Sequence, residues 1–158
     1  MYDLGLIKRI PRLAVINATG ANTLYHIFEK DGVRWNGGRY DHTRITDLYA
    51  EMDRTHYLPD TIASAIEIAR PVNLPKSIRA LDIMNGVVRE VSDEVILEHK
   101  ALVGKYGFGC EPASAASVAG AHLLLNEQII SPDETVVCIL TGHVLKAVSY
   151  THLTLPTN

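Results

Sequence analysis

The sequence lacks any long apolar run: its longest nearly apolar stretches, such as residues 136–140, are far shorter than the roughly 20 residues that span a bilayer. It also lacks a basic stripe, and its net charge of −3 gives no reason to expect a nucleic-acid partner. The first ten residues do not show the basic, apolar and small-residue order of a secretory signal. We therefore expect a cytoplasmic protein with neither a membrane nor a nucleic-acid partner.

Cysteine is scarce, and the residue patterns of several common active sites are missing. Cys110 and Cys138 form no Cys-x-x-Cys pair, so we expect free buried thiols and no disulfide framework. The seven histidines give no His-x-x-x-His or Glu-x-x-His pair on a clear helical face, and we expect no metal site. The sequence contains neither a Gly-x-Ser-x-Gly elbow nor a Gly-x-x-x-x-Gly-Lys phosphate loop.

What is present is the composition of one ordinary globular domain. The 158 residues are 47% hydrophobic and 21% charged, which is typical of such domains. Short apolar runs predict three strands, at residues 12–18, 87–91 and 135–140. The last run is continuously apolar, as in a strand that is buried on both faces of a parallel sheet.

Capping residues, prolines and apolar spacing predict the helices, which we place at residues 21–30, 75–84, 93–106 and 112–126. Residues 31–60 show little periodicity and are predicted to be a long excursion with one short helix near 47–53. Residues 61–68 fit either a helix or extended chain. The alternation of predicted strands and helices along the sequence predicts an α/β fold with a largely parallel sheet flanked by helices. Three strands are few for a complete sheet.

The step from Leu140 to His143 follows the last predicted strand. Ligands of open parallel sheets bind beyond the carboxyl ends of the strands. The Thr141 hydroxyl could donate a hydrogen bond to a bound heterocycle there, and Gly142 would let the backbone pass close to it. The alternative is an ordinary turn in which the threonine bonds only to backbone.

The predicted helix after Cys110 begins with small residues, in the order Glu111-Pro-Ala-Ser-Ala-Ala-Ser117. Its free N–H groups could face an anion, and its small side chains allow close approach of a backbone or a flat ring. The alternative is tight packing of the helix against the sheet, with Glu111 in solvent.

Three long segments, residues 11–25, 107–120 and 136–146, together resemble threonine synthases and follow the order of that family. Residues 61–73 and 86–94 fit the same pattern, so that the resemblance covers roughly residues 1–146. It implies part of a tryptophan-synthase-β-like domain, the architecture called fold type II, with pyridoxal 5'-phosphate (PLP) as cofactor. The implied reaction converts O-phospho-L-homoserine and water to L-threonine and phosphate.

The resemblance also assigns roles to two side chains. Thr141 matches the threonine that hydrogen-bonds the pyridine nitrogen of PLP, and Glu111 matches a glutamate that we expect near the cofactor. A neutral hydroxyl cannot hold that nitrogen protonated as a carboxylate would. The ring should therefore be a milder electron sink.

Two elements of the family pattern are missing. The six lysines, at positions 8, 30, 76, 100, 105 and 146, lie outside the Ser-Phe-Lys-Asp-like context of the Schiff-base lysine. The glycine- and asparagine-rich loop that grips the PLP phosphate is absent too. We therefore expect no catalytic residue of this kind in the chain, and an inactive fragment.

The end of the chain also departs from the family, which continues with Asp-Pro after Lys146. Residues 147–158 are therefore predicted to be a non-native tail that follows a PLP-enzyme portion at 1–146. Two rival interpretations remain: another fold type II enzyme, such as threonine dehydratase or cysteate synthase, and a non-catalytic module without the lysine. By analogy with the family, the complete protein would be a homodimer that acts on a small molecule. Reading the DNA upstream of Met1 would separate a truncated enzyme from a module.

Overall fold

The computed structural model describes residues 1–146, which form two compact units. The first unit consists of Met1–Asn17, Asn22–Leu58 and Ile68–Arg89. The second consists of Ala18–Ala21, Pro59–Glu67 and the chain from Glu90 to residue 146. The prediction that residues 147–158 are a non-native tail falls outside the described residues.

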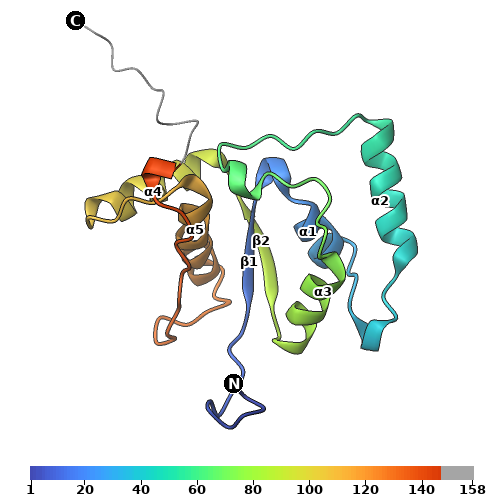
Figure 1. The fold of residues 1–158 in the computed structure, drawn as a ribbon, viewed down its shortest axis with the longest axis horizontal. Coiled ribbons are helices and arrows are strands. Elements are labelled where there is room, and N and C mark those ends of the chain that lie inside the picture. Colours follow the sequence, from blue (N-terminus) through green and yellow to red (C-terminus); the bar gives the residue numbers. More distant parts are fainter. Residues whose placement is uncertain (147–158) are drawn as a thin grey trace, which may run out of the picture. The chain divides into compact units, whose positions relative to one another are not determined.

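The sheet contains two parallel strands, β1 (Ala14–Ala18) and β2 (Val87–Val91), which lie side by side in Figure 1. The backbone N–H of Val87 donates to the carbonyl oxygen of Leu13 at 2.9 Å, at the start of the pairing. Helical segments connect the two strands, as parallel strands require. The predicted α/β class and the first two predicted strands are confirmed.

The helical stretch after β1 combines α1 (Thr23–Tyr25) with η2 (His26–Lys30), a turn of π-helix. This confirms the predicted helix at 21–30 in outline. Ile27 and Phe28 are buried, whereas Glu29 is directed to the second strand. Its Oε1 accepts a hydrogen bond from the Val88 N–H at 2.7 Å and lies 3.3 Å from Nη1 of Arg89.

Helix α3 (Leu74–Ile83) completes the core of the first unit and confirms the predicted helix at 75–84. Pro75 lies in its first turn, where a backbone N–H would have no partner within the helix, so that proline costs no hydrogen bond. Leu81 and Ile78 are fully buried. They pack in one cluster that comprises Leu24, Ile27, Phe28, Val33, Ile45, Leu74, Ile78, Leu81 and Val88.

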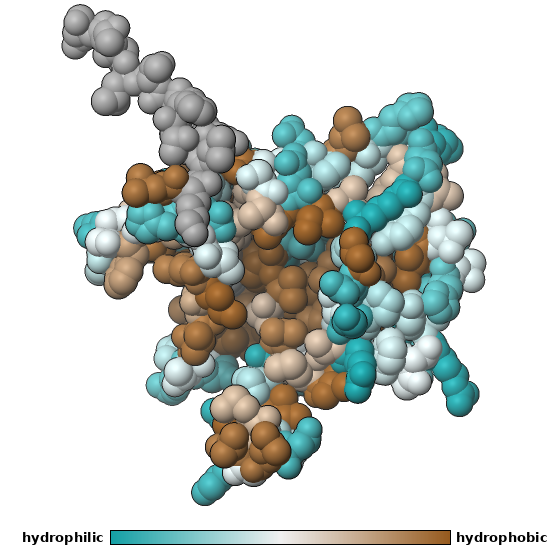
Figure 2. All heavy atoms as spheres, viewed as in Figure 1, coloured by the Kyte–Doolittle hydropathy of each residue, from teal (hydrophilic) through white to brown (hydrophobic). Residues whose placement is uncertain are grey.

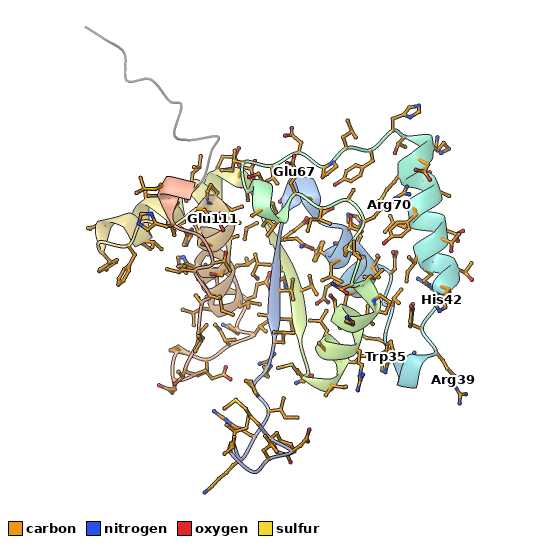
Figure 3. All side chains as sticks on the ribbon, viewed as in Figure 1. Trp35, Arg39, His42, Glu67, Arg70 and Glu111 are labelled. Atoms are coloured by element: carbon orange, nitrogen blue, oxygen red, sulfur yellow. The ribbon has the colours of Figure 1, made fainter. Side chains whose placement is uncertain are left out.

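The excursion contains more helix than the sequence predicted. After the short η3 (Asn36–Gly38), helix α2 covers His42–Arg54, whereas the prediction was a helix near 47–53 only. The Asp41 carboxylate accepts from the N–H groups of Thr43 and Arg44 and so starts the helix earlier. Trp35 stacks on Tyr40 before this start, at 5.8 Å between ring centroids (Trp35 and His42 are labelled in Figure 3).

The second unit is built on α4 (Asp93–Lys105) and α5 (Pro112–Asn126), which pack against each other and confirm two predicted helices. The Ser92 hydroxyl caps α4 by accepting from the Val95 N–H, and Gly107 ends the turn after α4 at a φ of +87°. Three 3-10 turns complete the unit: η1 (Thr19–Ala21), η4 (Ser64–Ile66) and η5 (Val144–Lys146).

The third predicted strand, residues 135–140, is wrong. This segment is irregular and largely exposed, with Val137 82% and Ile139 70% accessible. A strand is held by hydrogen bonds to a neighbouring strand, and no strand within residues 1–146 pairs with this run. Figure 2 shows apolar atoms at the surface of the chain after α5. The apolar composition therefore did not suffice to form a strand.

Over residues 1–146, no helix has both the length and the apolarity to cross a membrane.

Candidate functional site

The beginning of α5 holds the first of the predicted site residues. Glu111 has an extended backbone, with φ −72° and ψ 160°, and Pro112 follows as the first helical residue. The Glu111 carbonyl oxygen accepts from the N–H groups of Ser114 and Ala115, which starts the helix. Its carboxylate makes no capping bond and is therefore available for other contacts (Figure 3).

The chain after residue 140 returns to this helix start. Cys110 and His143 form an isolated antiparallel bridge. The Glu111 N–H donates to the Gly142 carbonyl oxygen at 3.0 Å, and the Val144 N–H donates to the Gly109 carbonyl oxygen at 3.3 Å. This backbone pairing brings Thr141 and Glu111, which are 30 positions apart, into one group.

At the start of α5, the side chains of Ser114, Thr141 and Glu111 are joined in series by hydrogen bonds. The Thr141 hydroxyl donates to Oε1 of Glu111 at 3.0 Å, and its oxygen lies 3.2 Å from the Ser114 hydroxyl. Each hydroxyl carries a single proton. Because Thr141 gives its proton to Glu111, Ser114 must donate to Thr141. The order is therefore Ser114 to Thr141 to the Glu111 carboxylate.

Ser114 is the buried anchor of this chain, with a side chain that is 1% accessible. Its hydroxyl oxygen also accepts from the Gly142 N–H at 3.1 Å. The same oxygen thus fixes both the backbone of the returning segment and the orientation of the Thr141 side chain. Thr141, the middle member, is exposed and Glu111 is half-buried, so that these two residues remain accessible to a small molecule.

The Glu111 carboxylate lies where a side chain at position 142 would begin. A Cβ atom there would overlap the Glu111 carboxylate and would approach its Oε2 to 2.5 Å. No larger residue could occupy this position while the carboxylate keeps its place. We expected Gly142 to let the backbone pass close to a ligand, and the group that lies close to it here is the Glu111 side chain.

Ser117, one turn further along α5, adds contacts between this helix and residues 138–139. Its hydroxyl donates to the Ser114 carbonyl oxygen at 2.7 Å and lies 3.4 Å from the carbonyl oxygen of Ile139. The Cys138 thiol in turn lies 3.6 Å from the Ser117 carbonyl oxygen. Serine at i and i+3 on one helix face is the sequence signal for this attachment. The sequence pattern alone predicted no role for either serine.

Both thiols are free, as predicted. Cys110 is buried, whereas Cys138 is only half-buried. Burial raises the pKa of the Cys110 thiol and of the Cys138 thiol. Both therefore remain protonated at neutral pH, which makes them poor nucleophiles.

No group of three or more histidine, cysteine, aspartate or glutamate side chains is placed to hold a metal ion, as far as the chain is described. The geometry that the structure offers is instead a set of neutral hydroxyls ending in one carboxylate. Within residues 1–146, the hydrogen bonds that join the Glu111, Ser114 and Thr141 side chains involve hydroxyls, the carboxylate and the Gly142 backbone, and no lysine or arginine. Such a set suits a polar neutral group better than an anion.

Known proteins resemble this chain over most of its length. Residues 4–142 match the family described as pyridoxal-phosphate dependent enzymes. The chain is 40% identical over 143 residues to the threonine synthase of Methanocaldococcus jannaschii, which covers 90% of this chain and 31% of that protein. It is 51% identical over 89 residues to the threonine synthase of Methanosarcina acetivorans, covering 56% of this chain and 22% of that protein.

A third relative is the threonine synthase of Mycobacterium tuberculosis (strain H37Rv), 32% identical over 146 residues, or 92% of this chain and 33% of that protein. The chain thus spans only about a fifth to a third of the length of these relatives. The family match extends from near the first residue through Thr141 and Gly142. The chain belongs to the family of pyridoxal-phosphate dependent enzymes.

Proposed function

We propose that this chain is a portion of a threonine synthase, a lyase that converts O-phospho-L-homoserine and water to L-threonine and phosphate. The observation that carries the proposal is the hydrogen-bonded series Ser114–Thr141–Glu111, which fixes the hydroxyl of the exposed residue Thr141. Support also comes from three relatives that are named threonine synthases and from the family match that includes Thr141.

The residues of this group fit one part of PLP. A ring nitrogen is a neutral acceptor, and a hydroxyl that is held from behind by a buried serine is a suitable donor for it. The dianionic phosphate of PLP would instead need cations or a cluster of free N–H groups, whereas the hydrogen bonds among these three side chains involve no lysine or arginine of the described chain. We therefore assign Thr141 and Glu111 to the ring end of the cofactor. When bound, PLP supplies an electron sink for the reacting carbon.

Thr141 has one proton and can serve one acceptor at a time. In the described chain that acceptor is Oε1 of Glu111. A ring nitrogen held at Thr141 would replace Glu111 as the acceptor of this hydroxyl proton, while Ser114 would continue to donate to the Thr141 oxygen. A neutral hydroxyl, unlike a carboxylate, would not hold that nitrogen protonated. Thr141 thus orients the ring and leaves its basicity nearly unchanged.

The chain alone is inactive under this proposal. The six lysines of the sequence lie outside the motif of the covalent lysine, and without that lysine no side chain here attaches the cofactor or shuttles the proton at the reacting carbon. We also propose that the complete enzyme is a cytoplasmic homodimer without a membrane or nucleic-acid partner.

The first experiment mixes the 158-residue chain with PLP and reduces the mixture with borohydride. We expect no internal-aldimine absorbance band before reduction, no single lysine labelled stoichiometrically by mass spectrometry, and no threonine from O-phosphohomoserine. Covalent labelling together with threonine production would refute the claim that this chain lacks the covalent lysine.

The second experiment uses the complete reading frame, recovered by reading the DNA upstream of Met1. We expect threonine and phosphate from O-phosphohomoserine, and no activity of similar size on threonine itself, which a dehydratase would consume. Thr141→Val should weaken PLP binding, whereas Thr141→Ser should keep most of it, because only serine retains the donor. Equal PLP affinity of the two variants would remove Thr141 from the cofactor site.

A further inference from the structure

Two histidines from different helices meet on the surface of the second unit. His99 lies on α4 and His122 on α5, and Nε2 of His99 is 3.1 Å from Nδ1 of His122. His122 is exposed and His99 is half-buried. The rings are inclined at 63° to each other, with 5.4 Å between their centroids. Solvent can therefore reach the edge at which the two nitrogens meet.

The protonation of His99 is fixed by its own helix. Its Nδ1 lies 2.8 Å from the carbonyl oxygen of Val95, one turn earlier. A carbonyl oxygen only accepts, so Nδ1 carries the proton and Nε2 of the neutral ring presents its lone pair. A ring N–H bonded to a backbone carbonyl is one of the ways in which proteins orient a metal-binding histidine.

The separation of the two nitrogens also suits a shared metal ion. Zn²⁺ binds imidazole nitrogen at about 2.0–2.1 Å. Two nitrogens that are 3.1 Å apart would then subtend an angle of roughly 100° at the ion, which lies between square and tetrahedral geometry. Without an ion the two rings face each other nearly head-on, with 5.4 Å between their centroids, so the rings must tilt, mainly that of the exposed His122, before both lone pairs converge on the ion. His122 is exposed, so its proton can move from Nδ1 to Nε2 through solvent and free the Nδ1 lone pair.

We propose that His99 and His122 form a two-histidine binding site for a divalent transition-metal ion of the Zn²⁺, Ni²⁺ and Cu²⁺ class, with Zn²⁺ as the first candidate. Imidazole is a good ligand for all three ions. The described residues offer no third histidine, cysteine or carboxylate ligand, so water completes the coordination. The bound ion joins α4 to α5, the helix that Glu111 precedes and whose first turn contains Ser114. The sequence expectation of no metal site considered only pairs within one helix.

The test is a Zn²⁺ titration of the full 158-residue chain, prepared without a histidine tag and followed by calorimetry. We expect one ion per chain. His122→Gln and His99→Gln should each weaken binding at least about tenfold, because even changes behind a metal ligand cost about 10–100-fold in affinity. His26→Gln is the matched control: His26 is exposed, lies outside α4 and α5, and its replacement should leave the affinity unchanged.

Two further measurements keep the result interpretable. Circular dichroism confirms that each variant is folded, and His122→Gln is the safer variant because its side chain is exposed. Imidazole ¹⁵N resonances of the parent chain should show His99 protonated at Nδ1 before Zn²⁺ is added, with the rings of His99 and His122 shifting together afterwards. Unchanged Zn²⁺ affinity of the folded His122→Gln variant, or no binding by the parent chain, would overturn the proposal.

Discussion

Two valine-rich segments of this chain look alike in sequence and differ in structure. Strand β2, Val87–Val91, pairs with β1, and Val88 is fully buried in the core of the first unit. Residues 135–140, in the second unit, are more apolar still, yet Ile139 is 70% accessible. What separates them is the neighbour: β2 has a strand and helices of its own unit to pack on. An apolar composition therefore permits burial, but a segment is buried as a strand only where other elements are available to pack against it.

The largest change in the free energy of unfolding should come from substitutions in the core of the first unit. Leu81→Ala in α3 removes a fully buried side chain from the cluster around Val88. It should lower the free energy of unfolding by about 2–5 kcal/mol in urea denaturation. Ile83→Ala, at an exposed position of the same helix, should change it by less than about 0.5 kcal/mol. Equal losses would mean that the core of the first unit is not packed as described.

A smaller loss is expected at the attachment of the returning segment. Ser114→Ala leaves the Gly142 N–H without its acceptor and Thr141 without its donor. Loss of a buried partner costs about 1–3 kcal/mol of unfolding free energy. Ser77→Ala, which removes a hydroxyl bonded only within its own helix, is the control and should cost less. Hydrogen exchange at Gly142 should accelerate in Ser114→Ala alone.

The contact between Gly142 and Glu111 predicts a coupled pair of substitutions. Gly142→Ala should push the Glu111 carboxylate away and break its hydrogen bond to Thr141. The free energy of unfolding should fall by about 0.5–1.5 kcal/mol. In a Glu111→Ala background the same change should cost clearly less, because the obstructing carboxylate is gone. A double-mutant cycle in urea measures this difference. An identical cost in both backgrounds would show that the methyl group meets something else.

The smallest effect should belong to the exposed apolar segment. Ile139→Ser changes a side chain that is 70% accessible, so the free energy of unfolding of the chain should change by less than about 0.5 kcal/mol. A loss as large as that of Leu81→Ala would mean that residues 135–140 are buried in solution. The contrast drawn between the two valine-rich segments would then disappear.

Local signals explain which parts of the fold could be predicted. Helix α5 was placed correctly because Pro112 marks its first turn, and α4 because Ser92 caps it and Gly107 ends the turn after it. The early start of α2 was missed because the capping role of Asp41 was not recognised. These signals act within a few residues, so that the sequence alone can reveal them.

The remaining features depend on contacts between distant residues. Thr141 and Glu111 were named as candidates, and the structure joins them by a hydrogen bond that no local pattern could show. Their roles toward a cofactor stay a prediction. Ser114 was missed as their link for the same reason. The strand predicted at 135–140 failed because pairing needs a partner that composition does not reveal. The His99–His122 contact spans 23 positions and two helices.

The π-helical turn at His26–Lys30 determines how the chain tolerates length changes. A π turn holds one residue more than an α turn, and here it directs Glu29 to the Val88 N–H and to Arg89. Deleting one residue from this turn would restore ordinary α geometry with little rotation of the chain before the turn against the chain after it, since five π residues and four α residues turn the backbone by nearly the same angle. The packing of the flanking segments could then survive while one of the five side chains of the turn is lost. Among homologous sequences, we therefore expect a single-residue gap to be tolerated here more readily than inside α3 or α5.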